Sequence, residues 1–585
     1  MVQQLSWKVG GQQGEGIEST GEIFSTALNR LGYYLYGYRH FSSRIKGGHT
    51  NNKIRVSTTQ VRSVSDDLDI LVAFDQETID VNVHELRVGG VVIADAKFNP
   101  NLPETCTTAT LYAVPFTEIA TELGTSLMKN MVAVGASSAV LHIDTEVFEE
   151  VVLEIFGKKG QKVVQKNMEA IKKGADYIRE QLGEQLETMK LDPADGKKRM
   201  FMIGNDAIAL GALAGGARFM PAYPITPASE IMEYLIKKLP QFGGTVIQTE
   251  DEIAACTMAI GANYAGVRAL TASAGPGLSL MMESIGLAGI TEQPVVIIDT
   301  QRGGPSTGLP TKQEQSDLMA MIYGTHGEIP KIVMAPSTVE EAFYDTIEAF
   351  NLAEEYQCPV IMLTDLQLSL GKQSVEPLDY NRVEIRRGKL QQGELEELEE
   401  KQYYKRYRVT EDGVSPRVIP GMKHGIHHVT GVEHDETGKP SESPVNRDDQ
   451  MNKRLRKTKG IRFNTPIHVH SHEKESDILF VGFNSTRGVI EEAMERLEQD
   501  GIKVNHAHIR LIHPFPADEL LPYVQGAKKV VVVENNATGQ LANILKMNIA
   551  SHDKIQSVLK YDGNPFLPQE VYAKSKEMFV LNGNV

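Results

Sequence analysis

Short apolar runs alternate with amphipathic stretches along most of the 585 residues, and this alternation limits the folds open to the chain. A short continuous apolar run is typical of a buried strand, whereas apolar residues three or four positions apart are typical of a helix packed on a sheet. Strands separated by helices predict mostly parallel sheets, whose ligands lie at the carboxyl ends of the strands. The sequence therefore predicts an α/β protein.

Changes in this pattern divide the chain into three α/β domains and one connector. The first domain spans 1–195 and ends in a turn-rich segment, and the second spans 196–372. Residues 373–475 hold few apolar residues, so we predict a connector with a charged helix over 393–405, and we interpret its charged runs as solvated helix faces. The last domain spans 476–585.

The predicted strands and helices lie in all three domains. Strands are predicted over 5–9, 70–74, 91–94, 131–134, 219–222, 245–248, 269–272, 295–299, 360–364, 478–481, 504–512 and 529–534. Helices are predicted over 148–189, 254–265, 280–286, 485–499 and 540–549. We find no internal repeat, which excludes a solenoid.

Composition narrows the classes of function. Lys and Arg number 60 against 76 Asp and Glu, a formal net charge of −16, which argues against a nucleic-acid partner. The three cysteines, Cys106, Cys256 and Cys358, stand far apart, so we expect no disulfide framework and no iron–sulfur cluster held by this chain alone. Residues 1–9 lack the apolar core of a signal peptide, and no apolar run is long enough for a membrane span. We expect a cytoplasmic protein without membrane contact.

Two glycine clusters in the first domain are candidates for binding an anion. Residues 10–16 follow a predicted strand and precede a helical pattern, where backbone N–H groups and the helix dipole favour negative charge. Their spacing matches neither a dinucleotide fingerprint nor a P-loop, so a tight turn that requires positive φ is an equally good interpretation. Residues 42–51 add Arg44 and Lys46 beside paired glycines, which favours an anionic ligand for this domain.

Four motifs of the second domain follow predicted strands or open predicted helices. They occupy 223–230, 248–255, 271–277 and 300–311. Two prolines hold Thr226 in extended backbone, although a rigid turn with Ser229 as helix cap explains the same residues. Acidic residues at the start of a helix commonly just complement its dipole. Arg302, the one cation of the last motif, suits bidentate binding of a carboxylate.

At these motifs the sequence resembles a known family, the 2-oxoacid:ferredoxin oxidoreductases. The segments that carry the resemblance are YPITP at 223–227, TASAGPG at 271–277, QRGGPSTG at 301–308, GGQQG at 10–14, KGG at 46–48, HPFP at 513–516 and ENNATGQL at 534–541. The second and third domains resemble the family's alpha subunit, and the first resembles its gamma subunit, fused in front of alpha. This arrangement is most similar to the two-subunit 2-oxoglutarate type.

The resemblance implies a fold, a reaction and partners. The three domains would be a gamma-type domain, a thiamine pyrimidine-binding-type domain and a transketolase C-terminal-like domain. The protein would use thiamine diphosphate at a site shared with a separate beta subunit, which would carry Mg²⁺ and the [4Fe–4S] cluster. A 2-oxoacid would be oxidatively decarboxylated to an acyl-CoA, with coenzyme A as co-substrate and electrons passing through beta to ferredoxin. The expected assembly is (alpha-beta)2.

The resemblance also implies roles for single residues. Glu252 would share a proton with N1′ of the cofactor, with Glu250 and Asp251 as alternatives, whereas Thr226 would bind the substrate near its reacting carbonyl and Arg302 would clamp the substrate carboxylate. Further cofactor contacts are implied for Tyr223, Ile225, Pro227, Gly275 and Pro276, and possible coenzyme A contacts for Gly11, Gly14, Gly16, Arg44 and Lys46. We expect no metal site in this chain, although His468, His470 and His472 alternate along a possible strand.

Other functions stay open. The same reaction on pyruvate or on branched 2-oxoacids needs no change in these motifs. A non-catalytic assembly module that kept the fold is an alternative of another class. A self-sufficient thiamine decarboxylase or transketolase is disfavoured, because the diphosphate motif GDG followed by Asn does not occur in the sequence.

Overall fold

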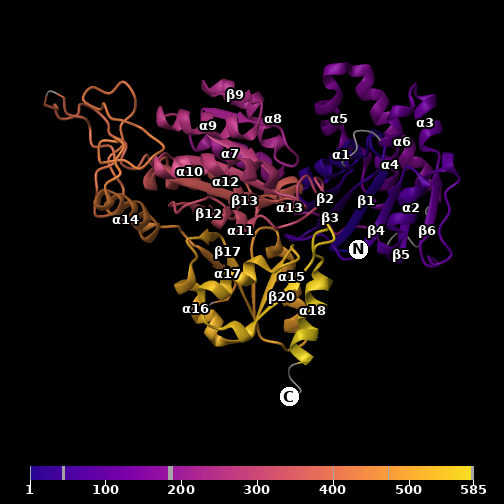
Figure 1. Ribbon diagram of the computed structural model, residues 1–585. Coiled ribbons are helices and arrows are strands. Elements are labelled where there is room, and N and C mark those ends of the chain that lie inside the picture. The colour runs from indigo at the N-terminus through magenta and orange to yellow at the C-terminus, as the bar shows by residue number, and fades with distance from the viewer. Residues whose placement is uncertain (1, 43–46, 182–188, 400, 472, 582–585) are drawn as a thin grey trace. The chain divides into compact units, whose positions relative to one another are not determined.

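A computed structural model describes residues 2–42, 47–181, 189–399, 401–471 and 473–581 (Figure 1). The chain forms two compact units. The first contains the residues up to Met202 together with Leu370–Pro377 and Leu567–Glu570, and the second contains Ile203–Ser369, Leu378–Phe566 and the chain from Val571 onward. Both units are α/β, which confirms the predicted fold class. None of the helices described is both long and apolar enough to cross a membrane.

One sheet of eight strands runs through the first unit, in the order β6-β5-β4-β1-β3-β2-β14-β7. The strands are β1 (Gln4–Gln12), β2 (Tyr34–His40), β3 (His49–Ser57), β4 (Leu68–Ala73), β5 (Leu86–Asp95), β6 (Thr110–Val114), β7 (Met200–Met202) and β14 (Gln373–Val375). β1, β4, β5 and β6 are parallel neighbours, and β3 runs antiparallel to β1. The prediction located β1, β4 and β5. It missed β3, whose polar residues hide the strand pattern.

Helices cover this sheet, and one of them replaces a predicted strand. They include α1 (Ile17–Arg30), α2 (Gln76–Asn82), α3 (Phe116–Glu122), α4 (Lys129–Val140), α5 (Glu149–Phe156) and α6 (Gln161–Gln181). Residues 131–134, predicted to be a strand, lie in α4, and that prediction is wrong. α4 is buried on almost every side, so its apolar residues show no helical period. A Cβ on Gly135 would lie 1.8 Å from the carbonyl oxygen of Ile171 in α6, a contact only glycine permits.

The second unit contains a central sheet in the order β10-β11-β13-β12-β18. Its strands are β10 (Leu270–Ser273), β11 (Val295–Gln301), β12 (Ile332–Met334), β13 (Pro359–Asp365) and β18 (Leu511–His513). The first four are parallel, as predicted, and β18 is antiparallel to β12. A smaller parallel pair, β8 (Phe219–Ala222) and β9 (Thr245–Gln248), meets this sheet where Phe219 bridges Ala269.

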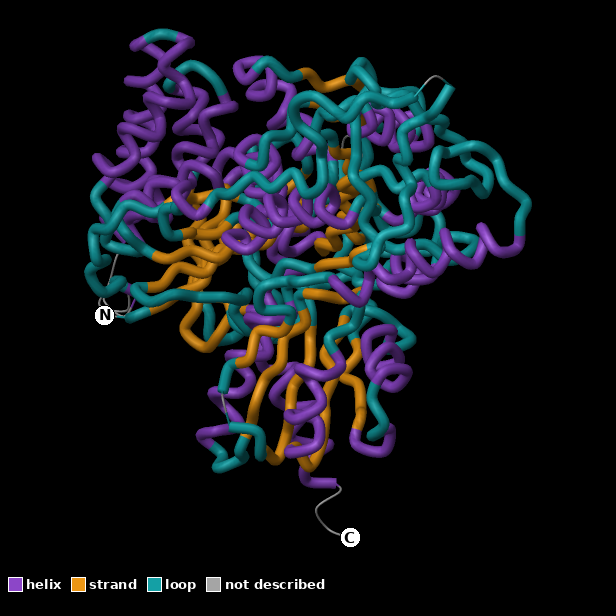
Figure 2. The backbone as a smooth tube through the Cα atoms, turned by 90° about the vertical axis from the view of Figure 1, so that its left-hand side faces the viewer, coloured by secondary structure: helices purple, strands orange, loops and turns teal. Residues whose placement is uncertain are grey.

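A five-stranded sheet in the order β15-β17-β16-β19-β20 forms the last domain. Its strands are β15 (Ile467–Val469), β16 (Ser476–Gly482), β17 (Val504–Ile509), β19 (Ala527–Glu534) and β20 (Ile555–Leu559). Alternate residues of β16 face opposite sides: Leu479 packs with α16 (Ala517–Gly526) and α17 (Gln540–Asn548), and Phe480 packs with α15 (Thr486–Gln499). Figure 2 shows these strands side by side with helices around them. The predicted strand 504–512 is two strands, β17 and β18, which belong to different sheets.

The connector is folded differently from the prediction. Residues 393–405 contain no helix where they are described; the connector's helix is α14 (Pro444–Gly460). Its basic run is not a solvated face, because Lys453 and Lys457 are fully buried and pair with Glu292 at 2.7 and 2.5 Å. Charged side chains of the connector therefore belong to the interior of the second unit.

Candidate active site

The predicted motifs of the second domain meet at one edge of the central sheet. β10 and β11 are parallel neighbours in which Ser273 lies opposite Asp299, so residues 271–277 and 300–311 leave the sheet at the same edge. β8 is aligned parallel to β10 through Phe219 and Ala269, and residues 223–227 follow its carboxyl end. The sequence folds this way because the motifs at 223–227, 271–277 and 300–311 each end a buried strand with glycine or proline. The location agrees with the rule that ligands bind at the carboxyl ends of parallel strands.

Glu252 differs in its burial from the other two carboxylates of its motif, Glu250 and Asp251. Asp251 caps α9 (Glu252–Tyr264) by accepting a hydrogen bond from the Ala254 N–H at 2.7 Å, and Glu250 is exposed. Glu252, in contrast, is only 6% exposed. A Cβ on Gly277 would lie 2.8 Å from Glu252 Oε1, so the carboxylate reaches the Gly275-Pro276-Gly277 turn.

Thr226 and Arg302, predicted to bind substrate together, are in contact. Arg302 donates from Nη1 to the Thr226 carbonyl at 2.6 Å and from Nη2 to the Thr307 carbonyl at 3.3 Å. The arginine is 7% exposed, and its Nε has no partner within the described residues. Burial lowers the pKa of Arg302, and the negative charge of Asp317 opposes this shift. Two backbone carbonyl groups therefore fix the position of the guanidinium.

The predicted cofactor contacts differ in exposure. Tyr223 is 38% exposed, Ile225 is half-buried and Pro227 is buried. Gly275 and Pro276 begin α10 (Gly275–Ile290), directly after β10. The structure thus places these five residues around the same sheet edge as Glu252.

The sequence prediction missed two carboxyl groups at this edge, Asp299 and Asp317. Asp299 on β11 is 0% exposed, and neither of its carboxyl oxygens has a partner among the described residues. Burial, and then nearby Asp317, raise the pKa of Asp299 well above its usual range. A Cβ on Gly275 would lie 2.6 Å from Asp317 Oδ1, so this carboxyl group packs against the turn. An aspartate at the end of an apolar strand was the available signal for Asp299.

The last domain holds the loop that carries Asp317. Gln315 donates its N–H to the Asn535 carbonyl at 2.7 Å, and Asn535 returns a hydrogen bond to Gln315 Oε1 at 2.9 Å. Gln540 Nε2 donates to the Ser316 carbonyl at 2.7 Å. The ENNATGQL motif therefore fixes a loop of the candidate site.

The glycine loop of the first unit is tightly packed at Gly11 and Gly16 but open at Gly14. Gly14 and Gly16 have φ of 98° and 84°, so both need the left-handed conformation. A Cβ on Gly14 would meet nothing within 4 Å, whereas one on Gly16 would lie 2.2 Å from Asn130 Nδ2. Glu15 pairs with Lys129 at 2.8 Å and so brings its own negative charge into the loop. Gly11 packs against Phe74.

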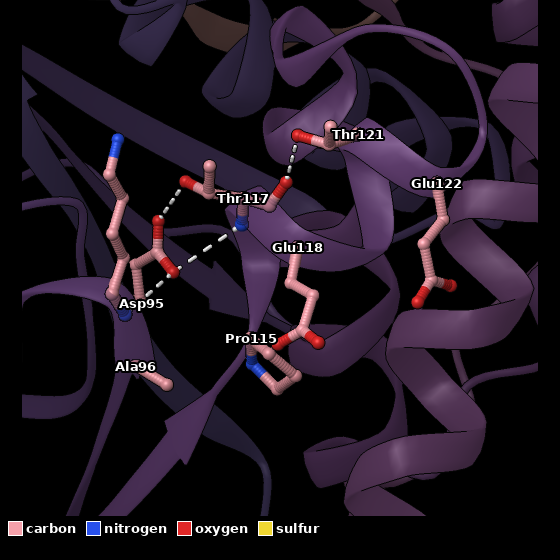
Figure 3. Close-up of a pocket in the computed structure, with 8 residues that line it drawn as sticks. Asp95, Ala96, Pro115, Thr117, Glu118, Thr121 and Glu122 are labelled. Atoms are coloured by element: carbon pink, nitrogen blue, oxygen red, sulfur yellow. Dashed lines mark hydrogen bonds between the residues drawn. The ribbon is translucent and has the colours of Figure 1, made fainter.

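Arg44 and Lys46, the predicted cations of this region, lie outside the described residues. A cavity of about 620 Å³ does occur at the carboxyl end of β5 and the start of α3 (Figure 3). It contains none of the predicted residues, and Asp95 there accepts a hydrogen bond from Thr117 Oγ1 at 2.5 Å. Its lining has three carboxylates, Asp95, Glu118 and Glu122, and one lysine, which is unfavourable for the phosphates of coenzyme A.

The histidines weighed as metal ligands have other contacts. His468 Nε2 lies 2.7 Å from Arg487 Nη2, and His472 lies outside the described residues. In the part of the chain that is described, no three His, Cys, Asp or Glu side chains form a group that could hold a metal ion.

Comparisons with known proteins cover almost the whole chain. Residues 6–177 match the family described as pyruvate ferredoxin/flavodoxin oxidoreductase, 210–453 match pyruvate flavodoxin/ferredoxin oxidoreductase, thiamine diP-bdg, and 476–571 match pyruvate:ferredoxin oxidoreductase core domain II. These three matches support the three predicted kinds of domain.

Full-length relatives give the same assignment. A 2-oxoacid:ferredoxin oxidoreductase subunit alpha of Sulfolobus sp is 35% identical, covering 100% of this chain and 99% of the relative. The 2-oxoglutarate oxidoreductase subunit KorA of Mycobacterium tuberculosis is 33% identical, covering 96% and 89%. The solved 2-oxoglutarate:ferredoxin oxidoreductase of Magnetococcus marinus, with 2-oxoglutarate, coenzyme A and succinyl-CoA bound, is 36% identical over 99% of this chain and 100% of that chain, with a TM-score of 0.92. The chain therefore belongs to the 2-oxoacid:ferredoxin oxidoreductase alpha subunits, with a fused gamma-like domain and a thiamine diphosphate-binding domain.

Proposed function

We propose that this chain is the alpha subunit of a 2-oxoglutarate:ferredoxin oxidoreductase that forms succinyl-CoA. The relatives from M. tuberculosis and Magnetococcus marinus, both named for 2-oxoglutarate, support this substrate. The observation that carries the proposal is Glu252, a residue only 6% exposed whose carboxylate lies beside a glycine turn at the carboxyl end of β10.

The residues at this edge fit the aminopyrimidine ring of thiamine diphosphate. Glu252 Oε1 reaches the turn, and Ser273 Oγ is buried without a partner among the described residues. A Cβ on Gly277 would lie 2.0 Å from Ser273 Oγ, so glycine is needed for the turn to pass this close. Glu252 would hold a proton at ring nitrogen N1′, with Tyr223, Ile225, Pro227, Gly275 and Pro276 around the ring. When bound, the cofactor supplies the carbanion that attacks the 2-oxo carbon.

Arg302 and Thr226 would position the substrate. The Arg302 guanidinium is planar and can bind a carboxylate with two parallel hydrogen bonds. Its contact with the Thr226 carbonyl holds it beside the motif that would face the reacting carbonyl group. Both side chains would thus orient the 2-oxoacid relative to Glu252.

The remaining steps, acyl transfer and electron transfer, would involve coenzyme A and a second subunit. We assign residues 1–195 the contact with coenzyme A, at Gly11, Gly14 and Gly16, because the loop lies between β1 and a helix start and because the Magnetococcus marinus enzyme was solved with coenzyme A. A beta subunit would carry Mg²⁺ and a [4Fe–4S] cluster and would pass electrons to ferredoxin, in an (alpha-beta)2 assembly. The name alpha subunit in the relatives supports such a partner.

The proposal is tested with the chain purified together with its partner subunit. Reduction of ferredoxin is measured with 2-oxoglutarate, pyruvate and branched 2-oxoacids, each with coenzyme A. We expect 2-oxoglutarate to give the highest kcat/KM. A higher kcat/KM with pyruvate or with branched 2-oxoacids would show that 2-oxoglutarate is not the preferred substrate. Absence of turnover with all of these 2-oxoacids would favour a non-catalytic assembly module.

Glu252→Gln tests the catalytic residue in the same complex. We expect a loss of kcat of at least 10²-fold, because the amide cannot exchange a proton with N1′. Glu250→Gln is the matched control, since Glu250 is exposed and lies in the same motif. Near-normal turnover of Glu252→Gln would remove this residue from the mechanism.

A further inference from the structure

Two carboxyl groups lie on either side of the Gly275-Pro276-Gly277 turn. Glu252 packs against Gly277, and Asp317 packs against Gly275, where a Cβ would lie 2.6 and 2.7 Å from its two carboxyl oxygens. Glu252 belongs to the proposed catalytic machinery, whereas Asp317 has no part in it so far. Asp317 Oδ2 is buried without a partner among the described residues. A buried carboxyl group of this kind is costly and calls for an explanation.

The charged neighbours of Asp317 come from two segments, β11 with the residue that follows it and the loop that leads to Asp317. Asp299 lies on β11 and is completely buried, Arg302 follows the same strand, and Glu314 lies three residues before Asp317 on the loop. Asp299 has no donor for either oxygen among the described residues, so it stays protonated. Burial and Glu314 raise the pKa of Asp317 to about 6, while Arg302 lowers it. Asp317 is thus the member of the pair that ionises near neutral pH.

We propose that Asp317 is a positioning residue that acts as the counter-charge of Arg302 and sets how strongly the site binds the carboxylate of a 2-oxoacid. Ionised Asp317 partly neutralises the positive potential at Arg302, whereas protonated Asp317 leaves the full charge of the guanidinium to the substrate. The carboxyl group of Asp299, which is near Asp317, stays neutral, so the two carboxyl groups together carry at most one negative charge. The inference rests on the proposed contact between Arg302 and substrate.

The last domain gives this counter-charge a fixed place. Asp317 donates its N–H to Gln301 Oε1 at 3.2 Å, and Gln301 Nε2 donates to Asn484 Oδ1 at 3.3 Å. Two residues further along, the Met319 N–H donates to Gln540 Oε1 at 2.9 Å. Asp317 is therefore held from both sides, so it cannot move away from Arg302 without breaking contacts of the last domain.

The sign of the pH effect follows from these charges. As pH rises through about 6, Asp317 ionises, the potential at Arg302 falls and the KM for 2-oxoglutarate rises. Asp317→Asn keeps the shape of the side chain and removes its charge. We expect this variant to have a KM roughly threefold to tenfold lower than wild type at pH 7.5, and a KM that no longer changes between pH 5 and 8. A merely structural role predicts lower kcat and lower stability with an unchanged pH profile of KM.

Two further variants sharpen the kinetic experiment, which uses the complex with the partner subunit. Glu314→Gln removes a charge that raises the pKa of Asp317, so the midpoint of the KM profile should move to lower pH. Asp299→Asn replaces a neutral group by another neutral group, so the profile should keep the wild-type shape. A higher KM in Asp317→Asn, or a midpoint that Glu314→Gln does not move, would overturn the inference.

Infrared spectroscopy of the full chain tests the carboxyl pair without any activity. Asp345 and Glu534 are also buried carboxyl groups with raised pKa values, so the bands are read from difference spectra between wild type and variant. The difference between wild type and Asp299→Asn should contain the carbonyl band of a protonated carboxyl group at pH 7. The difference between wild type and Asp317→Asn should contain a band that disappears between pH 5 and 7. If both bands are found but 2-oxoglutarate is not turned over, the proposed function fails and the carboxyl pair stands. If turnover is normal and the bands are missing, the inferred protonation of Asp299 and Asp317 is wrong.

Discussion

At the scale of single residues, the candidate site was predicted from motifs that follow strands or begin helices. Glu252, Thr226 and Arg302 were predicted from motifs, and the structure brings them to one sheet edge. Their assigned roles stay predictions. Asp299 and Asp317 were not predicted, because neither period nor motif tells which loop packs against which strand end. Contacts between loops distant in sequence depend on tertiary packing, which local patterns do not contain.

Arg302→Lys tests the geometry of substrate binding. A lysine keeps the positive charge but loses the planar pair of donors, so we expect the KM for the 2-oxoacid to rise by about 10-fold to 100-fold, with a smaller change in kcat. Steady-state kinetics of the complex at pH 7.5 measure this. Arg382→Lys serves as control, because Arg382 is exposed and contacts Glu340 at 3.9 Å and the Tyr344 ring at 4.1 Å from its centroid. Equal KM values for both variants would mean that Arg302 does not bind substrate.

At the scale of elements, α/β units were predictable and the connector was not. Period and turn residues located most strands of the two five-stranded sheets of the second unit, as well as α9, α10, α15 and α17. The basic run of α14 was interpreted as solvated, because lysines are rarely buried without partners. Its partner, Glu292, lies 161 residues before Lys453, a separation at which sequence gives no indication of pairing. Helix α4 was mistaken for a strand for another reason: it is buried on nearly all sides, so its apolar residues show no helical period.

Glu292→Gln tests whether the connector is part of the core. The change leaves Lys453 and Lys457 buried without their counter-charge, which should reduce the free energy of unfolding by about 3–5 kcal/mol. Urea unfolding followed by circular dichroism measures the loss. Glu340→Gln, in an exposed pair, should change it by about 1 kcal/mol or less. Equal effects of the two substitutions would show that the connector packs loosely.

At the scale of the whole molecule, the order of domains was predictable because each domain repeats one pattern. Family matches follow the same order from residue 6 to residue 571. The formal charge of −16 argues against nucleic acid as a partner class but does not show which carboxylates are buried. Buried, paired carboxylates decide how stability changes with pH, and they occur in both units.

Glu85→Gln should change the acid stability of the first unit. Glu85 pairs with Lys53 at 3.0 Å and with Lys8, and these lysines, against the effect of burial, lower the pKa of Glu85 to about 2. A lowered carboxyl pKa stabilises the fold above pH 4.5, and this contribution is lost as pH falls from about 4.5 to about 2. We expect the variant to be less stable at pH 7 and to lose less stability between pH 5 and 3. Unfolding curves at a series of pH values measure this, and parallel curves for wild type and variant would contradict it.

Strand β18 makes the central sheet dependent on a late part of the chain. Val333 of β12 pairs with His513, and Pro514 then ends the strand, since proline has no N–H to donate. During synthesis, β12 leaves the ribosome long before its neighbour exists, and its outer backbone groups remain unpaired until residues 511–513 emerge. An unpaired edge invites association with other chains. Translation must therefore pass beyond the candidate site by some 200 residues before β12 gains this neighbour.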